Sequence, residues 1–287
     1  MRIAVFGVGG VGGYFGGRLA QAGEDVVFIA RGEHLQALQT HGLRVESVLG
    51  DFVVKPVHAT DDPTHVGVVD AILVGVKAWQ VSEVAEAMRP LVGPKTCVVP
   101  LQNGVEAPGQ LAAVLGASHV VGGLCALFSF VSAPGHIRHS GAEPFVEFGE
   151  LDNRPSPRLN HLRNAFVRAG VTVEIPSDIQ CELWMKFLFI TPFSGLGTLT
   201  RIPVGIWRSV PETRRMSEQA IHEVLAVAYA RGIALPADAT STVMAQLDSL
   251  PPEAMPSMQR DMLAGRPSEL DMHMLSVKGC DPPRQMN

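Results

Sequence analysis

One lysine interrupts an apolar run near residue 186 and could carry acid–base chemistry. From Leu183 to Ile190 every residue is apolar except Lys186, and a helix that is apolar on all sides is normally buried. Burial of a lysine disfavours its charged form, which eases the release of its proton. A structural explanation is also available, because Glu182 lies one helical turn earlier and because long lysine stems reach to water. The pattern therefore predicts either a proton-donating lysine or a paired structural one.

A glycine-rich turn at residues 7–12, with the sequence GVGGVG, offers a second kind of chemistry. It directly follows the first predicted strand and opens the first predicted helix, the context in which GxGxxG indicates dinucleotide binding. The first glycine would permit the tight turn, the second would let the backbone approach a pyrophosphate, and the third would let helix and strand pack closely. The helix N-terminus would supply amide donors and positive potential, although a turn without a ligand is the alternative. The predicted cofactor-binding residues of this turn are Gly7, Val8, Gly9, Gly10, Val11 and Gly12.

The residue that follows the second predicted strand bears on the choice between NAD and NADP. An acidic residue there binds the ribose 2′-hydroxyl, whereas an arginine accommodates a 2′-phosphate. The strand VVFIA is followed by Arg31, and neither Ala30 nor Gly32 is acidic. Because the planar guanidinium suits phosphate, Arg31 predicts NADPH as the cofactor. A plain surface arginine is the alternative.

Polar side chains also follow two other predicted strands. Lys77 comes after the strand at 70–76, and Asn103 comes after the strand at 97–101. In a doubly wound sheet, ligands bind beyond the carboxyl ends of the strands. We therefore expect Lys77 and Asn103 to face the cofactor or the substrate, although Asn-Gly is also a common turn signal.

The elements that must position these residues alternate between strand and helix in the first half of the chain. We predict strands at 3–6, 26–30, 70–76 and 97–101, and helices at 11–22, 33–40 and 81–88. A hairpin is predicted at 43–58, and strand-like pieces from 119 to 150 should extend or finish the sheet. A helix at 160–169 and a last strand at 171–175 should follow. Strands interleaved with helices indicate a mostly parallel, doubly wound sheet.

The pattern becomes helical after residue 177. We predict helices at 178–190, 212–231 and 237–250, with short helical pieces from 257 onward. The sequence therefore predicts an α/β protein with a Rossmann-type doubly wound dinucleotide-binding domain over residues 1–176. An all-helical substrate or catalytic domain should occupy residues 177–287.

Composition narrows the classes of function. The chain has 287 residues, of which 46% are hydrophobic and 18% charged, with a net charge of −5 and no basic stripe, which argues against nucleic acid as a partner. No apolar stretch reaches about 18 residues, and the N-terminus runs directly into a strand, so neither a membrane span nor a signal peptide is expected. The four scattered cysteines fit a reduced, cytoplasmic protein. His136 and His139 form an HxxH pair without an evident third ligand, so no metal is expected.

Together these residues resemble the ketopantoate reductase (2-dehydropantoate 2-reductase) family. The resemblance is carried, through about residue 271, by GVGGVG, Arg31, VKAWQV with Lys77, QNG with Asn103, ELWMK with Lys186, and SMQRDMLAGRPSELD. It implies NADPH-dependent reduction of a 2-oxo acid, most directly 2-dehydropantoate to pantoate in pantothenate and coenzyme A biosynthesis. A homodimer is a possible assembly of the chain.

The resemblance also implies roles for single residues. Lys186 would be the general acid, and Glu269 would hold its ammonium or the new hydroxyl. Ser257 would bind the substrate carboxylate, and Asn103 would contact both substrate and cofactor.

Two stretches depart from the family pattern. The family commonly has asparagines one and two helical turns after the lysine, where this chain has Ile190 and Ser194, and Pro192 between them should kink the helix. Ser194 is kept as a substrate-binding candidate, and the more apolar pocket could take another branched or aromatic 2-oxo acid. From Asp271 the chain reads DMHMLSVKGCDPPRQMN, so we expect a helical domain shortened at its C-terminal end. A non-catalytic dinucleotide-binding protein with a disabled site is therefore a further alternative.

Overall fold

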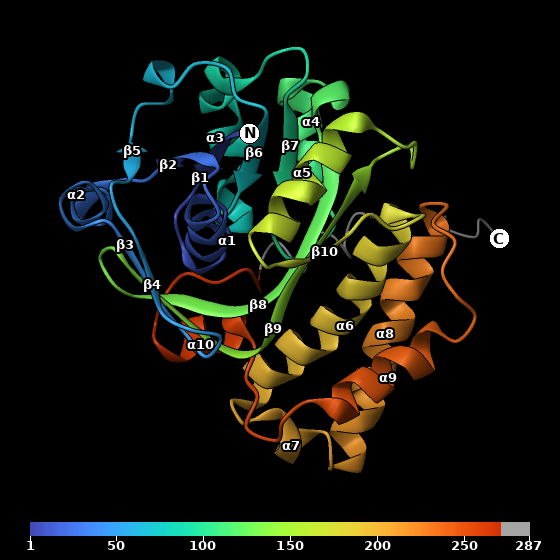
Figure 1. Ribbon diagram of the computed structural model, residues 1–287. Coiled ribbons are helices and arrows are strands. Elements are labelled where there is room, and N and C mark those ends of the chain that lie inside the picture. Colours follow the sequence, from blue (N-terminus) through green and yellow to red (C-terminus); the bar gives the residue numbers. More distant parts are fainter. Residues whose placement is uncertain (271–287) are drawn as a thin grey trace. The chain divides into compact units, whose positions relative to one another are not determined.

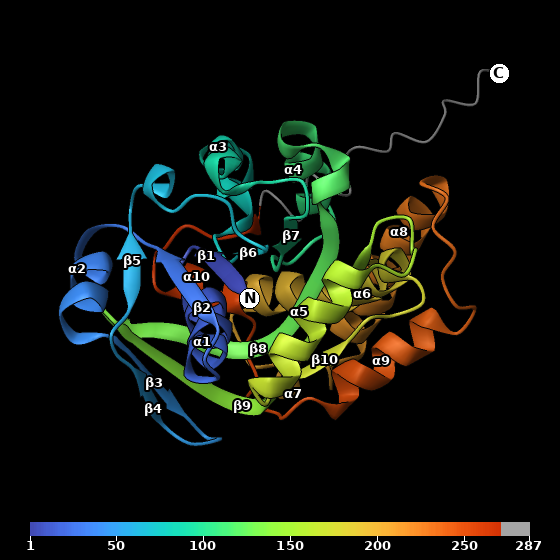
Figure 2. The same cartoon turned by 45° about the horizontal axis from the view of Figure 1, so that its top comes forward.

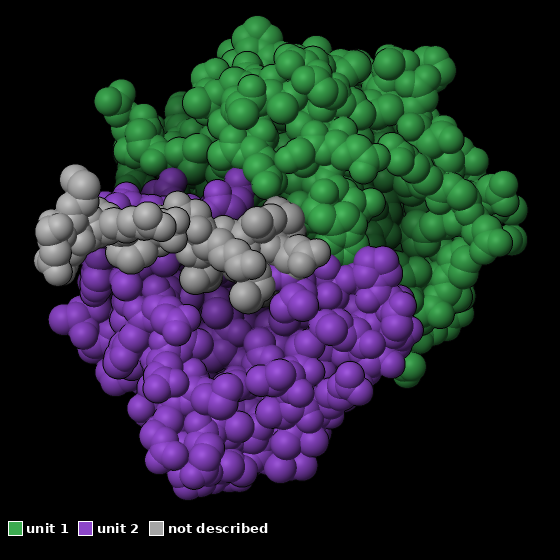
Figure 3. Space-filling view, turned by 180° about the vertical axis from the view of Figure 1, so that it is seen from behind, with its two compact units in different colours: residues 1–102, 107–179 green, residues 103–106, 180–287 purple. Residues whose placement is uncertain are grey.

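The chain alternates strands and helices in its first part and is helical in its last part, as Figures 1 and 2 show. The computed structural model describes residues 1–270, so the altered stretch 271–287 lies outside the described residues. The chain divides into two compact units (Figure 3): residues 1–102 with 107–179, and residues 103–106 with those from 180 onward. The predicted α/β fold class with a helical C-terminal part is confirmed.

A parallel five-stranded sheet organises the first unit. Its strands, in spatial order, are β5 (His58–Thr60), β2 (Asp25–Ile29), β1 (Arg2–Phe6), β6 (Ala71–Val74) and β7 (Cys97–Pro100). All four pairings are parallel, and every residue of β6 and β7 is buried, which is typical of strands covered on both faces. Phe6 lies opposite Ile29 and Val74, so neighbouring strands end side by side. The predicted doubly wound sheet is therefore confirmed.

Helices cover both faces of this sheet because successive strand residues point to opposite sides. Ile3 and Val5 of β1 belong to one apolar cluster, with α1 (Gly10–Gln21), α2 (Gly32–His41) and α5 (Pro157–Arg168). Ala4 and Phe6 belong to the other, with α3 (Val81–Ala87) and α4 (Ala107–Leu115). The two clusters make the sheet the central layer of the unit.

The stretch from 119 to 150 does not extend the parallel sheet, so that expectation is wrong. It forms two long antiparallel strands, β8 (Val121–Ala133) and β9 (His136–Glu150). They build a second sheet with three shorter strands: β3 (Leu43–Ser47), β4 (Phe52–Val54) and β10 (Thr172–Glu174). Only one isolated bridge, Val98 to Val120, joins the start of this stretch to β7 among the described strands. The predicted hairpin forms as β3–β4, but its last residue, His58, begins β5, which pairs in the first sheet.

The second unit is built around one long helix. Its helices are α6 (Ile179–Thr200), α7 (Val204–Trp207), α8 (Pro211–Ala230), α9 (Ala239–Ser249) and α10 (Ser257–Leu263). The expected end of the first helix near 190 is wrong, because α6 continues through Pro192. Leu188 and Ile190 before the proline and Phe193 after it are buried in one cluster, and this packing outweighs the lost backbone hydrogen bond.

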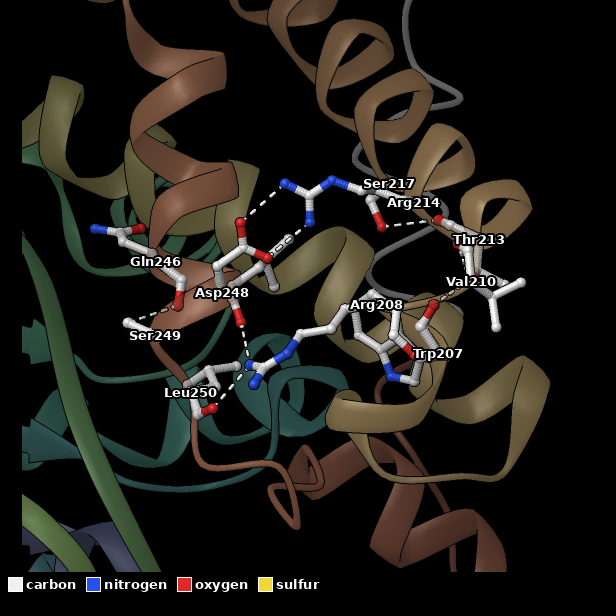
Figure 4. A network of polar contacts seen from close by, with 12 residues as sticks. Trp207, Arg208, Val210, Thr213, Arg214, Ser217, Gln246, Asp248, Ser249 and Leu250 are labelled. Carbon is white, nitrogen blue, oxygen red and sulfur yellow. Dashed lines mark hydrogen bonds and ion pairs between the residues drawn. The ribbon is translucent and has the colours of Figure 1, made fainter.

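Polar contacts fix the helices that pack around this cluster (Figure 4). Arg208 donates to the carbonyls of Leu247 and Leu250, each at 2.8 Å, and so satisfies the C-terminal end of α9. Arg214 of α8 and Asp248 of α9 form a two-pronged ion pair at 2.7 and 2.8 Å.

None of the helices between residues 1 and 270 is both long and apolar enough to cross a membrane.

Residues 103–106 belong to the helical unit although their neighbours on both sides do not. Val105 packs against the apolar cluster of the helices. Glu106 accepts a hydrogen bond at 2.6 Å from Arg231, whose guanidinium also lies 5.5 Å from the ring centroid of Trp184. The sequence pattern did not indicate this assignment.

Candidate active site

The glycine-rich turn leaves β1 through a conformation that only glycine adopts easily. Gly7 has φ of +95°, and its N–H donates to the Ile29 carbonyl at 3.1 Å. A Cβ on Gly7 would lie 2.7 Å from the main-chain nitrogen of Val76. The turn is therefore wedged between the ends of β2 and β6.

The N-terminus of α1 leaves room for a pyrophosphate at Gly9. Gly9 is its N-cap, no described side chain caps the helix, and the first amides of a helix have no partner within it. A Cβ on Gly9 would meet nothing closer than the Gly75 carbonyl oxygen at 3.9 Å, so a ligand can approach the backbone here. A Cβ on Gly12 would overlap the Gly7 carbonyl oxygen, which explains the third glycine as a packing requirement. The residues present fit a dinucleotide pyrophosphate.

The segment that leads to Lys77, another predicted cofactor residue, lies at the same edge of the sheet. Gly75 N donates to the Phe6 carbonyl at 2.8 Å, which places the segment leading to Lys77 beside the glycine turn. The Nζ of Lys77 lies 5.8 Å from the ring centroid of Trp79. Asn103 follows the neighbouring strand, and the chain bends at residues 103–106, where Gly104 has φ of +97°. Asn103 itself is grouped with the helical unit.

Arg31 lies two residues after the end of β2 and is the N-cap of α2. Its side chain is exposed, and no carboxylate between residues 1 and 270 lies within ion-pair distance of it. Because the end of β2 is bonded to the glycine turn, Arg31 lies at the same edge as Gly7. A guanidinium in this place fits a 2′-phosphate.

His34 on the first turn of α2 is a residue that sequence reasoning missed. Its Nδ1 accepts a hydrogen bond at 3.1 Å from the N–H of Gly135, in the turn between β8 and β9. Burial lowers the pKa of His34 below its ordinary value, and the nearby carbonyl of Val8 opposes the shift. Helix α2 is thus held to the β8–β9 turn through a neutral imidazole.

The HxxH pair is explained by packing. His139 is buried, its Nδ1 lies 2.8 Å from the Ser47 hydroxyl, and its ring centroid lies 4.7 Å from that of Tyr14. Within residues 1–270 no group of three or more His, Cys, Asp or Glu side chains is placed to hold a metal.

The remaining predicted residues lie in the helical unit. Lys186 is half-buried on α6, between buried Trp184 and Phe187, so the lysine does emerge from an apolar helix. Ile190 and Ser194, further along α6, are 9% and 1% exposed, so the Ser194 hydroxyl is nearly covered. Substrate binding by Ser194 stays a prediction.

Ser257 and Glu269 come from the end of the described chain. Ser257 is the first residue of α10, and Glu269 is 6% exposed. A Cβ on Gly197 of α6 would lie 2.7 Å from Gln259 Oε1 and 3.2 Å from Pro256, so the start of α10 packs on the C-terminal half of α6. Lys186 lies on the same face of α6 as Gly197 but about 16 Å away along the helix axis.

Comparisons with known proteins agree with the two-part organisation. Residues 3–153 match the family model described as ketopantoate reductase PanE/ApbA, and residues 178–275 match the model of its C-terminal part. The uncharacterized oxidoreductase YkpB of Bacillus subtilis is 30% identical over 94% of this chain and 89% of its own length. A 2-dehydropantoate 2-reductase of Mesorhizobium japonicum is 29% identical over 97% of this chain and 90% of its own. The crystal structure of 2-dehydropantoate 2-reductase from Geobacter metallireducens is 32% identical, with a TM-score of 0.89 over 97% of this chain and 94% of that one.

Proposed function

We infer that this chain, which belongs to the ketopantoate reductase family, reduces a 2-oxo acid with NADPH, most directly 2-dehydropantoate to pantoate. The observation that carries the proposal is that family models match both parts of the chain, the part with the glycine-rich turn and the part with Lys186. The open N-terminus of α1 supports the dinucleotide as ligand. Such a product would serve pantothenate and coenzyme A biosynthesis.

The proposed chemistry divides between cofactor and protein. A bound NADPH would supply a hydride to the carbonyl carbon of the 2-oxo group. Lys186 donates a proton from its ammonium to the carbonyl oxygen, which gives the 2-hydroxy acid. Glu269 orients that ammonium or the new hydroxyl, and Ser257 and Asn103 hold the substrate. Lys186 is half-buried on an apolar helix, which supports its role as proton donor. Partial removal from water strengthens the electrostatic interaction between its ammonium and the substrate oxygen.

Arg31 supports NADPH rather than NADH as the reductant. Its exposed guanidinium follows β2 and has no acidic partner among the described residues. A 2′-phosphate would provide the two-pronged partner that a guanidinium prefers. NADPH would therefore give the Arg31 guanidinium a phosphate partner, which NADH lacks.

A second candidate substrate class follows from α6. Ile190 places an apolar side chain one turn beyond Lys186, and it offers no hydrogen bond to a substrate hydroxyl. Sites without such a partner discriminate weakly between an acid with the hydroxyl and one without it. Another branched or aromatic 2-oxo acid is therefore the alternative substrate.

Oxidation of NADPH in the presence of a panel of 2-oxo acids tests the proposal. The panel contains 2-dehydropantoate, 2-oxoisovalerate, which lacks its hydroxyl, and an aromatic 2-oxo acid. The highest kcat/KM with 2-dehydropantoate is the expected result. A preference for another member selects the second candidate. Dinucleotide binding without any turnover points to a non-catalytic binding protein, and absence of dinucleotide binding contradicts the proposal.

A further inference from the structure

Gln102 is a buried amide at the end of β7 to which neither the cofactor nor the substrate assignment gives a role. Its side chain is 6% exposed. Its Nε2 donates to two main-chain carbonyls of the neighbouring strand end, Val74 at 2.8 Å and Val76 at 2.9 Å. The backbone connection between these strand ends stops earlier, with Leu101 N donating to the Val74 carbonyl at 3.1 Å. Gln102 therefore extends the link between β6 and β7 beyond the sheet.

The main chain at Val76 is the surface on which the glycine turn rests. A Cβ on Gly7 would lie 2.7 Å from Val76 N and 2.7 Å from Val76 Cγ1, so the two segments are already at contact distance. The next residue is Lys77, whose N–H donates to Gln80 Oε1 at 3.2 Å. A shift of Val76 would therefore displace Gly7 and Lys77 together.

Only one orientation of the Gln102 amide fits this place. A turned amide would put Oε1 against two carbonyl oxygens and would lose both hydrogen bonds. In the observed orientation Oε1 is buried without a partner among the residues that the structure describes. A buried acceptor without a partner costs stability, and an apolar side chain of the same length would avoid that cost. Burial alone thus does not account for a glutamine at this position.

We propose that Gln102 is a positioning residue for the dinucleotide. Its amide fixes the main chain of Val76, so that the glycine turn and Lys77 keep the spacing that the bound dinucleotide requires. The inference rests on the proposed function, because that function makes a dinucleotide the ligand at the carboxyl ends of the parallel strands. Gln102 acts through Val76 and does not itself touch the ligand.

The variant Gln102→Met tests this, because methionine has a similar length and no amide. We expect the Kd for NADPH, titrated by fluorescence without any 2-oxo acid, to rise about tenfold or more. The KM for NADPH should rise in parallel, while kcat at saturating NADPH stays within about threefold. The thermal midpoint should change little, because the loss of two hydrogen bonds is offset by removal of the unsatisfied oxygen. A merely structural glutamine would instead change the thermal midpoint and leave the Kd of the folded protein unchanged.

Gln259→Met is the matched control. Gln259 is 0% exposed, donates through Nε2 to the Ile202 carbonyl at 3.2 Å, and also has a buried Oε1 without a partner among the described residues. It lies in the helical unit, so this variant should keep the wild-type Kd for NADPH. Equal weakening by both variants would overturn the inference, because it would make the effect a general one of losing a buried amide.

Gln102→Leu is a second test variant, since leucine fills similar space and has no group that can donate to the two carbonyls. Circular dichroism establishes that each variant is folded. An unchanged Kd in either folded variant overturns the positioning role, and so does failure of both to fold. A wild-type chain that binds no dinucleotide overturns the proposed function as well, so the two failures are told apart by the wild-type titration.

Discussion

Among single side chains, Lys186 is the group on which turnover should depend most. Lys186→Ala should lower kcat by about 10²–10⁴, the usual contribution of a positioned general acid. Its Kd for NADPH should stay at the wild-type value, because the glycine turn lies in the other unit. Stopped-flow or steady-state NADPH oxidation measures the first quantity and fluorescence titration the second.

Lys95→Ala provides the control for this variant, because Lys95 is an exposed lysine outside the proposed site. It should turn over at the wild-type rate. If folded Lys186→Ala also does so, the lysine returns to the structural alternative of an ion-paired or solvent-reaching side chain.

Arg31 should decide between the two nicotinamide cofactors. Arg31→Ala should lower kcat/KM for NADPH by about 10–100-fold, as expected for losing hydrogen bonds to a charged group. The value for NADH should change little, because NADH has no 2′-phosphate. Steady-state kinetics with both cofactors measures the ratio, and Arg44→Ala, at a side chain 51% exposed, is the control. Equal losses for both cofactors would contradict the assignment.

Several side chains at the proposed site were predictable because the rules that place them are local. The glycine spacing, the residue after the second strand and the lone lysine in an apolar run can each be read within a few residues. Gln102 and His34 could not be assigned in this way. Gln102 bonds to residues 26 and 28 positions away, and His34 to a residue 101 positions away, so their partners depend on tertiary structure. The QNG motif was the one available signal for Gln102.

At the scale of elements, the link between α2 and the β8–β9 turn should make stability depend on pH. The pKa of His34 in the folded chain lies below its ordinary value of 6.5 because of burial. As pH falls, the unfolded chain therefore takes up the proton before the folded chain does. The stabilisation from neutral His34 is complete above about pH 6.5 and is lost as pH falls through the pKa of the folded chain. Protonated Nδ1 can no longer accept from the Gly135 N–H.

The variant His34→Asn, which keeps an acceptor but does not titrate, measures this effect. Between pH 7.5 and 5 the wild-type free energy of unfolding in urea should fall by about 1 kcal/mol more than that of the variant, the size of one hydrogen bond. His65→Asn, at an imidazole that is 80% exposed, should follow the wild type. Parallel pH curves for wild type and His34→Asn would show that this link does not titrate.

The elements that the sequence misjudged are those in which packing overrides a local signal. Periodicity indicated strands between 119 and 150, but alternation cannot tell which neighbour a strand will pair with. The predicted helix ended at 190, shortly before Pro192, yet apolar residues on both sides of that proline hold α6 in one cluster. Four of the five parallel strands were recovered because continuous apolar runs are a strong signal, whereas the short strand β5 was missed.

At the scale of the whole molecule, the chain passes between its two units at three places, after residues 102, 106 and 179. A hydrophobic pattern read along the chain indicates one change of character, near 176, because a four-residue excursion is too short to alter it. The membership of residues 103–106 rests on Val105 and on the pair of Glu106 with Arg231, which only the folded structure reveals.

The assignment of residues 103–106 to the helical unit limits where this protein can be joined to a relative in a chimaera. A chimaera joined only near residue 179 would combine the helices of one parent with Val105 and Glu106 of the other. The transplanted helices would then meet a foreign side chain at their apolar cluster and a foreign partner for Arg231. A transfer of the helical unit into a relative therefore has to include two separate segments of the chain. A single crossover near residue 179 would leave residues 103–106 behind.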